Sequence, residues 1–349
     1  MTPYTDLSLT AQTGYSQLLD AALSAEHMRS VADLSGSFAP KTVKGHRYWY
    51  FQYTEPSGQL RQIFVGPESD AVKTLIERKS VAGATGALTA LARSAIALGC
   101  ADVLPRHFRV IRRLAEYGFF RAGGVLIGTH AFLAFGNMLG VAWTQSARTQ
   151  DIDFAHAGKS LALVLPADIE VQTHEAIQSL DMGFLPLSGL SSKAGATYLN
   201  PREPDFRLDF LTTLHRGGET PFEHPRLHVM LQPLKFMEFS LEDVQQAVLF
   251  CAEGAVVVNL PHPARYALHK MLVYGERSGT FAAKGNKDVI QAGSLLALLK
   301  ERRPWEVEEA WADLTARGKG WASRVKQGLR AVDKAFPLMQ LRDWLKLPG

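Results

Sequence analysis

Two aspartates separated by a single residue are the part of this sequence best suited to chemistry. Asp151 and Asp153 lie in segment 149–154, with Ile152 between them and Phe154 after them. If the segment is a strand, period-two alternation places both carboxylates on one face and both apolar side chains in the core. Two like charges held this close favour a divalent cation with hard oxygen ligands. The same Asp-x-Asp spacing also occurs in many soluble proteins without such a role.

A glycine–threonine turn precedes the aspartates. The apolar run 123–127 predicts a strand, Gly128-Thr129 a tight turn, and residues 130–135 a helix. Gly128 permits a sharp turn and the close approach of a ligand, and we expect Thr129 to cap the helix. Exposed N–H groups at the helix start suit phosphate oxygens. The alternative is an ordinary capped core helix.

A third carboxylate follows in a predicted strand. Side chains alternate over residues 206–211, so the three apolar ones point inward while Arg207 and Asp209 share the opposite face. The alternative is a solvent-facing ion pair between these two residues.

Two predicted helices further along the chain carry lysines. Residues 263–272 predict a helix with Lys270, and residues 284–292 predict the start of another with Lys287 and Asp288. Each segment is also typical of a solvated helix surface. Their order after the three carboxylates is what makes them informative.

In this order the residues resemble the DNA polymerase β-like nucleotidyltransferase superfamily, nearest to its AbiEii-type and MenT-type toxin branch. The resemblance covers residues 123–299, about half of the chain. Residues 130–150 make the interval between turn and aspartate pair longer than is usual in the family, and an extra helical turn or loop around 136–140 would absorb the difference. The matched positions are Gly128, Thr129, Thr149, Asp151, Asp153, Asp209, Lys270, Lys287 and Asp288.

The resemblance implies an enzyme that moves a nucleoside monophosphate from an NTP to an acceptor hydroxyl, with Mg²⁺ or Mn²⁺ as cofactor. It implies metal binding by Asp151, Asp153 and Asp209, and Asp209 would orient or deprotonate the acceptor. Lys270 and Lys287 would neutralise the triphosphate. The implied catalytic set is Asp151, Asp153, Asp209, Lys270 and Asp288, and the implied nucleotide-binding set is Gly128, Thr129, Thr149, Lys270 and Lys287.

The acceptor is left open by these residues. The toxin-like resemblance favours tRNA and a cognate antitoxin partner, whereas protein AMPylation and small-molecule adenylylation use the same core. A different class of function is a nucleic-acid-binding protein on a non-catalytic transferase scaffold. The complete set of three aspartates favours the enzyme.

Composition limits the class of protein. The chain has 349 residues with 46% hydrophobic content, enough for a substantial core and two or three domains. Two cysteines, Cys100 and Cys251, argue against a disulfide framework. The N-terminus lacks the pattern of a signal peptide, and no apolar run reaches the roughly 20 residues that span a bilayer. We therefore expect a cytoplasmic protein without a membrane segment.

We expect an α+β fold with three regions. Residues 1–118 predict an N-terminal helical module with a β-hairpin of strands 46–53 and 59–66 around a turn at 55–58. Residues 119–300 predict a small mixed-sheet nucleotidyltransferase core with flanking helices. Residues 301–349 predict a helical C-terminal region, in which Trp305 and Trp311 are expected packing anchors.

Positive charge is concentrated before the core. Residues 41–118 contain 12 Lys and Arg against 6 Asp and Glu, a net charge of +6, whereas the whole chain carries +4. The aromatic, basic hairpin would suit phosphates and unpaired bases, or its rings would pack on the core. A second basic element is the predicted helix with arginines 106, 109, 112 and 113, which would either steer anions or form a solvated face.

Overall fold

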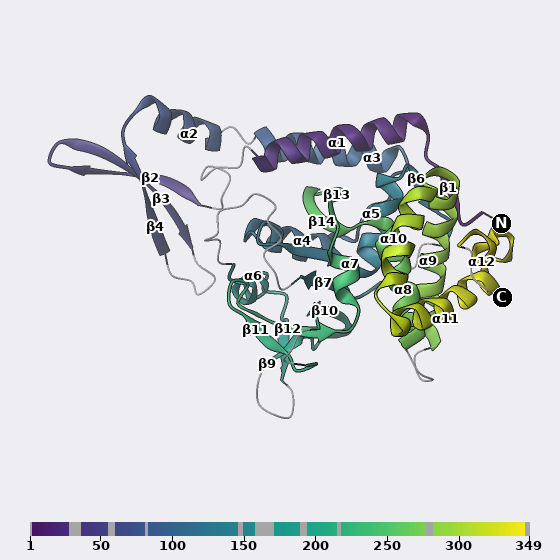
Figure 1. The fold of residues 1–349 in the computed structure, drawn as a ribbon. Helices are drawn as coiled ribbons and strands as arrows, with labels where there is room; N and C mark the ends of the chain where they lie inside the picture. Colours follow the sequence, from purple (N-terminus) through teal and green to yellow (C-terminus); the bar gives the residue numbers. More distant parts are fainter. Residues whose placement is uncertain are drawn as a thin grey trace.

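A computed structural model provides the coordinates of the protein. It describes residues 2–27, 36–54, 60–80, 83–145, 149–157, 171–188, 194–214, 218–276 and 282–345. A central sheet lies between a bundle of C-terminal helices on one side and a small N-terminal module on the other (Figure 1). The two chain ends lie near each other beside the helical bundle.

The central sheet is mixed and has seven strands, five of which run in the order β11–β12–β10–β7–β5. Strands β7 and β12 are parallel to β10, whereas β5 is antiparallel to β7. Strands β8 and β9 extend the sheet, with β9 antiparallel to β10. The strands are β5 (Gly124–Ile127), β7 (Ile152–His156), β8 (Leu185–Ser188), β9 (Ala194–Asn200), β10 (Glu203–Thr213), β11 (Phe222–His224) and β12 (Val229–Leu234).

Alternating side chains fix the two central strands in the core. Ile152 and Phe154 of β7 are fully buried, as are Leu208 and Phe210 of β10. The rings of Phe154 and Phe210 stack with centroids 5.2 Å apart, which adds specific packing to the hydrophobic burial. The predicted period-two pattern is therefore confirmed on both strands.

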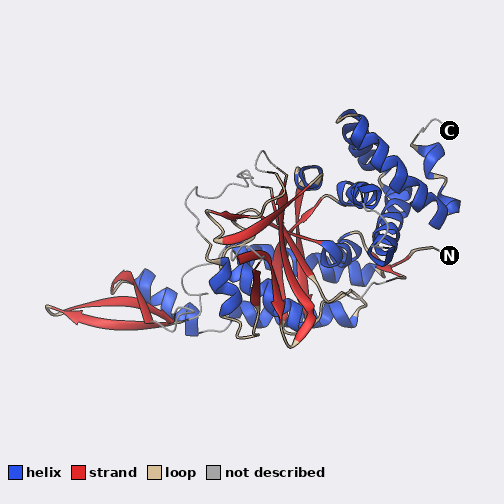
Figure 2. Cartoon of the chain, turned by 90° about the horizontal axis from the view of Figure 1, so that it is seen from below, coloured by secondary structure: helices blue, strands red, loops and turns tan. Residues whose placement is uncertain are grey.

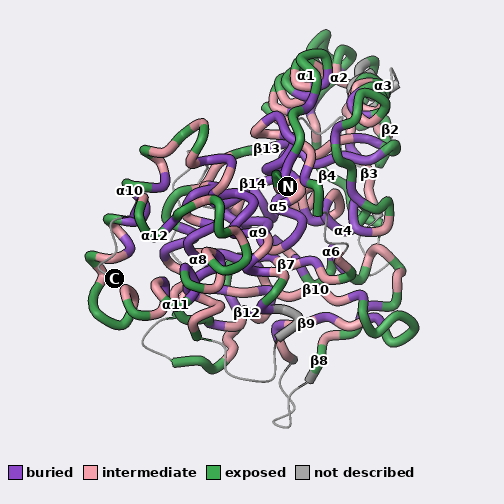
Figure 3. The backbone as a smooth tube through the Cα atoms, turned by 90° about the vertical axis from the view of Figure 1, so that its right-hand side faces the viewer, coloured by how far each residue is buried: buried purple, intermediate pink, exposed green. Residues whose placement is uncertain are grey.

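Helices cover the sheet and a separate hairpin. Helix α4 (Pro105–Glu116) and helix α5 (Gly128–Met138) pack into the main core, as do the short helices α6 (Thr173–Gln178) and α7 (Met237–Leu241). Helices α1 (Leu9–His27) and α3 (Gly83–Ala97) pack on the hairpin of β13 (Val244–Cys251) and β14 (Gly254–Pro261). Figure 3 shows buried backbone concentrated around α5, α8, α9 and β7.

The C-terminal helices form a bundle beside the sheet (Figure 1). They are α8 (Pro263–Glu276), α9 (Ala282–Arg302), α10 (Pro304–Ala316), α11 (Lys319–Ala335), the 3-10 helix η2 (Pro337–Met339) and α12 (Leu341–Trp344). Trp311 is buried as expected, but the prediction for Trp305 is wrong, because its side chain is 60% exposed on the outer side of α10.

The N-terminal module is a three-stranded antiparallel sheet with one helix. Its strands are β2 (Ser37–Val43), β3 (His46–Thr54) and β4 (Leu60–Pro67), and its helix is α2 (Asp70–Ser80). The predicted hairpin is confirmed as β3–β4, while strand β2 was not expected. The predicted turn at 55–58 lies outside the described residues.

Taken together, these elements confirm the α+β fold with a small mixed sheet. Within the described residues, no helix combines the length and apolar character needed to cross a bilayer.

Candidate active site

The carboxylates gather where β7 and β10 run side by side. Asp209 is the register partner of Asp153 on the parallel neighbouring strand, so both side chains emerge on the same face of the sheet. Asp151 lies directly before β7. Burial and the charge of Asp209 raise the pKa of the Asp153 carboxyl to about 6. The three predicted aspartates thus lie on one face of the sheet.

Gly128 is required by its closeness to these carboxylates. Its φ is +66°, in the left-handed region that glycine adopts without strain. A Cβ at this position would lie 2.0 Å from Oδ2 of Asp153. Only a hydrogen atom fits between the start of α5 and the aspartate.

Thr129 does not cap helix α5 as expected. The helix begins at Gly128, its N-cap residue is Ile127, and no side chain caps it. Thr129 is instead buried, and its Oγ1 accepts a hydrogen bond of 3.3 Å from Nε2 of Gln291. Thr129 therefore lies inside the helix, where its hydroxyl connects α5 to α9.

The long interval between the turn and the aspartates is occupied by regular structure. Helix α5 continues to Met138, and β6 (Val141–Trp143) follows it. Strand β6 pairs with β1 (Tyr4–Asp6) near the start of the chain. The residues of this interval thus extend α5 and form the strand that pairs with β1.

The opposite wall of the site comes from α8 and α9. Nζ of Lys270 donates a hydrogen bond of 2.7 Å to Oδ1 of the buried Asp288. Burial lowers the pKa of Lys270, but Tyr266 and Asp288 outweigh it and leave the pKa raised. Burial and the nearby Lys270 lower the pKa of Lys287, which forms no ion pair with any described residue.

Tyr266 and Gln291 are site residues that the sequence reasoning missed. The hydroxyl of Tyr266 donates to the carbonyl oxygen of Gly128 at 2.8 Å and lies 2.9 Å from Oε1 of Gln291. Both residues tie the helical wall to the start of α5. Tyr266 lies one turn before Lys270, so the i, i+4 spacing on a helix was the available signal.

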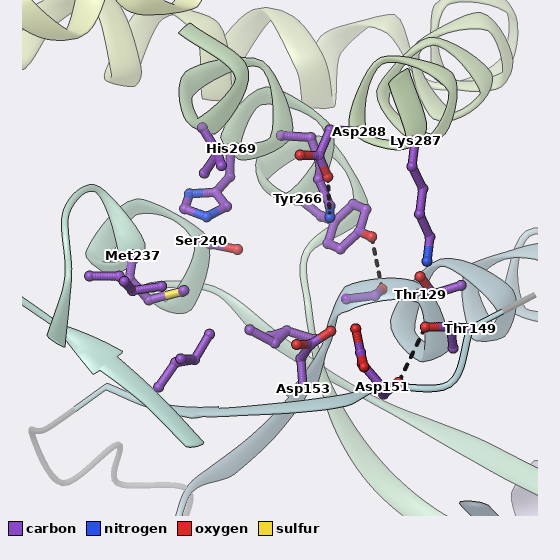
Figure 4. A pocket seen from close by; sticks show the side chains of 16 residues that line it. Thr129, Thr149, Asp151, Asp153, Met237, Ser240, Tyr266, His269, Lys287 and Asp288 are labelled. Atoms are coloured by element: carbon purple, nitrogen blue, oxygen red, sulfur yellow. Dashed lines mark hydrogen bonds and ion pairs between the residues drawn. The ribbon is translucent and has the colours of Figure 1, made fainter. Parts of the chain in front are cut away.

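These side chains enclose a cavity of about 180 Å³ between the sheet and the helices (Figure 4). Lys287 reaches from α9 toward Thr129 and Thr149, while Met237, Ser240 and His269 lie at the other end. The lining residues are Ile127, Gly128, Thr129, Thr149, Asp151, Asp153, Leu211, Leu234, Met237, Ser240, Tyr266, His269, Lys270, Val273, Lys287 and Asp288. Asp209 is not among these lining residues, and its Oδ1 accepts a hydrogen bond of 2.6 Å from Oγ1 of Thr197.

A match of the sequence to a family model identifies the family of the chain. A family model described as nucleotidyltransferase matches residues 106–316, more than half of the chain. The chain belongs to the nucleotidyltransferase family. It is therefore an enzyme of the class that transfers nucleoside monophosphates from NTP substrates.

Two further comparisons were made with this nucleotidyltransferase chain, against curated proteins and against solved structures. No curated protein matches the chain. One solved structure aligns with it, that of an antigenic nucleotidyltransferase-like protein from Paracoccidioides brasiliensis. That protein is 15% identical, and the alignment covers 65% of this chain and 95% of that chain with a TM-score of 0.31.

The donor chemistry of the site fits a divalent cation. Asp153 and Asp209 face each other across two strands, and their repulsion contributes to the raised pKa of Asp153. Carboxylate oxygens are the ligands that Mg²⁺ and Mn²⁺ prefer. Among the residues that the structure describes, no three His, Cys, Asp or Glu side chains already enclose a metal position. Asp151 is turned to Arg207, whose Nε lies 3.3 Å from Oδ1.

Proposed function

We propose that this nucleotidyltransferase moves an NMP from an NTP to a hydroxyl group of RNA, with tRNA as the favoured acceptor. The observation that carries the proposal is the arrangement of one cavity: aspartates on the sheet face the helix start at Gly128 and the lysines of α8 and α9. Anionic phosphates and cations both find partners there.

Divalent metal binding is part of this proposal. Asp151, Asp153 and Asp209 would hold Mg²⁺ or Mn²⁺, which when bound supplies charge neutralisation for the triphosphate and the leaving oxygen. Arg207 would release Asp151 at that point, because its guanidinium occupies the carboxylate in the ion pair.

The two ends of the cavity suit different parts of an NTP, which defines the orientation that we propose. We place the triphosphate at the end with Thr129 and Lys287, where the uncapped N–H groups of α5 and an ammonium without an ion-pair partner among the described residues are available. The nucleoside would then extend toward Met237, Ser240 and His269. That end combines apolar contact with a hydroxyl and an imidazole, which suits a nucleobase.

The proposed reaction is a displacement at the α-phosphorus. The acceptor oxygen forms a bond to this phosphorus, the bond to the bridging oxygen breaks, and pyrophosphate leaves. Asp209 would take the acceptor proton, since Thr197 orients its carboxylate through Oδ1. Lys287 would neutralise the leaving pyrophosphate, and Asp288 would hold Lys270 beside the cavity.

The toxin-like branch is the finer part of the proposal. The resemblance in the order of the turn, the aspartates and the lysines supports it, and with it a tRNA acceptor and an antitoxin partner. Protein hydroxyls and small molecules are the alternative acceptors for the same cavity.

The testing experiment incubates the protein with each radiolabelled NTP, Mg²⁺ or Mn²⁺ and total cellular RNA, with Asp151→Ala in parallel. Label in an RNA band with the parent protein alone supports the proposal and identifies the nucleotide. Label on protein redirects it to protein hydroxyls. Equal labelling by the Asp151→Ala variant contradicts the assigned site, and no label on RNA or protein redirects the proposal to a small-molecule acceptor.

A further inference from the structure

The N-terminal sheet has one face that its own helix leaves uncovered. On the inner face, Phe51 is fully buried and Val72 of α2 lies beside Gly66. The register of β2–β4 places a second set of side chains on the opposite face. We call it the outer face, and it consists of Lys41, Tyr48, Tyr50, Gln52, Gln62 and Phe64.

The aromatic rings on the outer face are partly accessible, since Tyr48 and Tyr50 are half-buried and Phe64 is exposed. The ring of Phe64 lies 5.4 Å from Tyr50 and 6.1 Å from Tyr48, measured between centroids. Phe64 is 56% exposed although it is a large apolar side chain. Figures 1 and 2 show the module standing apart from the central sheet and the helical bundle. A cluster of rings on a projecting sheet indicates a surface that meets another molecule.

The charge of the sheet selects the kind of partner. The described residues of β2, β3 and β4 and the β2–β3 turn include no Asp or Glu, and the cation on the outer face is Lys41. Arg47 lies on the inner face and pairs with Glu68. Nζ of Lys41 lies 4.6 Å from the centre of the Tyr50 ring and also donates to Gln62. An ammonium directly beside a partly exposed ring can bind a phosphate while the ring stacks on the attached base.

We infer that the outer face binds single-stranded nucleic acid. Tyr48, Tyr50 and Phe64 offer stacking surfaces, Lys41 binds the backbone, and the amides of Gln52 and Gln62 can hydrogen-bond to base edges. A duplex hides its bases, so it would use the cations but not the rings. This binding is independent of the transfer reaction, and the inference stands or fails separately from the proposed function.

Fluorescence anisotropy with the full chain, without NTP, tests the inference. The probes are a labelled single-stranded RNA of mixed sequence, the DNA of the same sequence and the corresponding duplex. The double variant Tyr50→Ala/Phe64→Ala should weaken single-strand binding at least about tenfold, and Lys41→Gln should weaken it and reduce its salt dependence. Tighter binding of RNA than of DNA assigns the surface to RNA, and equal binding supports recognition by stacking and phosphate alone.

Matched control variants test whether a loss of nucleic-acid binding is specific to the outer face. Trp305→Ala removes an exposed ring of α10, and Lys73→Gln removes an exposed cation from α2 of the same module. Both should bind like the parent. Equal affinity of parent and Tyr50→Ala/Phe64→Ala would overturn the inference, as would tighter binding of the duplex. A parent dimer that Phe64→Ala converts to a monomer would instead assign the face to a second copy of the chain.

Discussion

The two lysines of the site differ in what surrounds them, and their substitution should separate stability from binding. Lys270→Met removes the ammonium 2.7 Å from the buried Asp288. We expect a loss of about 1.5–3 kcal/mol in the free energy of unfolding, since the buried Asp288 carboxylate loses a charge-assisted hydrogen bond. Lys287→Met should leave stability nearly unchanged and weaken NTP binding. Chemical denaturation and calorimetric titration measure the two effects, and similar losses of stability in both variants would contradict this division.

The Asp153 carboxyl should make stability depend on pH. Its pKa rises from 3.8 to about 6 on folding. The unfolded chain therefore ionises first as pH increases, and the free energy of unfolding falls between about pH 4 and pH 6 by up to about 3 kcal/mol. With chelator present, Asp153→Asn should raise the melting temperature at neutral pH and change it little near pH 4. Asp205→Asn, at an exposed position of β10, is the control. A melting temperature lowered equally at both pH values would disprove the assignment.

At the scale of elements, the start of α5 depends on a missing side chain. Gly128→Ala would place a Cβ 2.0 Å from Asp153 in a left-handed conformation, so we expect transfer activity to fall at least about a hundredfold. Gly183→Ala is the matched control, because Gly183 has φ +77° but nothing within 4 Å of the added Cβ. Backbone strain is the only cost of Gly183→Ala, so this control should keep its transfer activity. Comparable activity of the two variants, each normalised for folded protein, would contradict the role of Gly128.

Strands and helices were predictable where one face is apolar. The alternation in 206–211 was sufficient to place Asp209 opposite the core, and β10 carries it as expected. Strand β2 escaped prediction because Pro40 interrupts its pattern, which an edge strand tolerates. The contact between Tyr266 and Gly128 spans 138 residues of sequence, and no local pattern reports such a distance. The Thr129 cap failed for a related reason, since Gln291 of α9 provides a tertiary partner.

At the scale of the whole molecule, the site lies between two walls that a bound nucleotide should hold together. An NTP with Mg²⁺ would contact the sheet through Asp151 and Asp153 and the helices through Lys287. We expect a stabilisation of about 3 kcal/mol at a hundredfold excess over Kd. Thermal shift should report the overall stabilisation, and hydrogen exchange should slow in β7 and in α9 alike. Protection of one wall without the other would contradict a bridging nucleotide.

The division into 1–118, 119–300 and 301–349 is retained as a proposal. Residues 1–118 include α1 and α3, which pack on β13–β14 in the middle of the chain, and also the module of β2–β4. Charge and turn patterns could separate the basic module from the core. They could not assign α1 and α3 to the hairpin, because that packing depends on complementary surfaces between distant segments.

The pairing of β1 with β6 supports the cavity from outside its lining. Beyond its pairing with β6, β1 reaches the end of α9: the Tyr4 hydroxyl donates to Oε2 of Glu301 at 2.6 Å, and Arg302 bonds to Asp6. The helix held in this way is the one that carries Lys287 and Asp288. Residues Tyr4–Asp6 therefore connect the end of this helix to the strand that follows α5. We expect a molecule that paired with β6 in place of β1 to weaken nucleotide binding without entering the cavity.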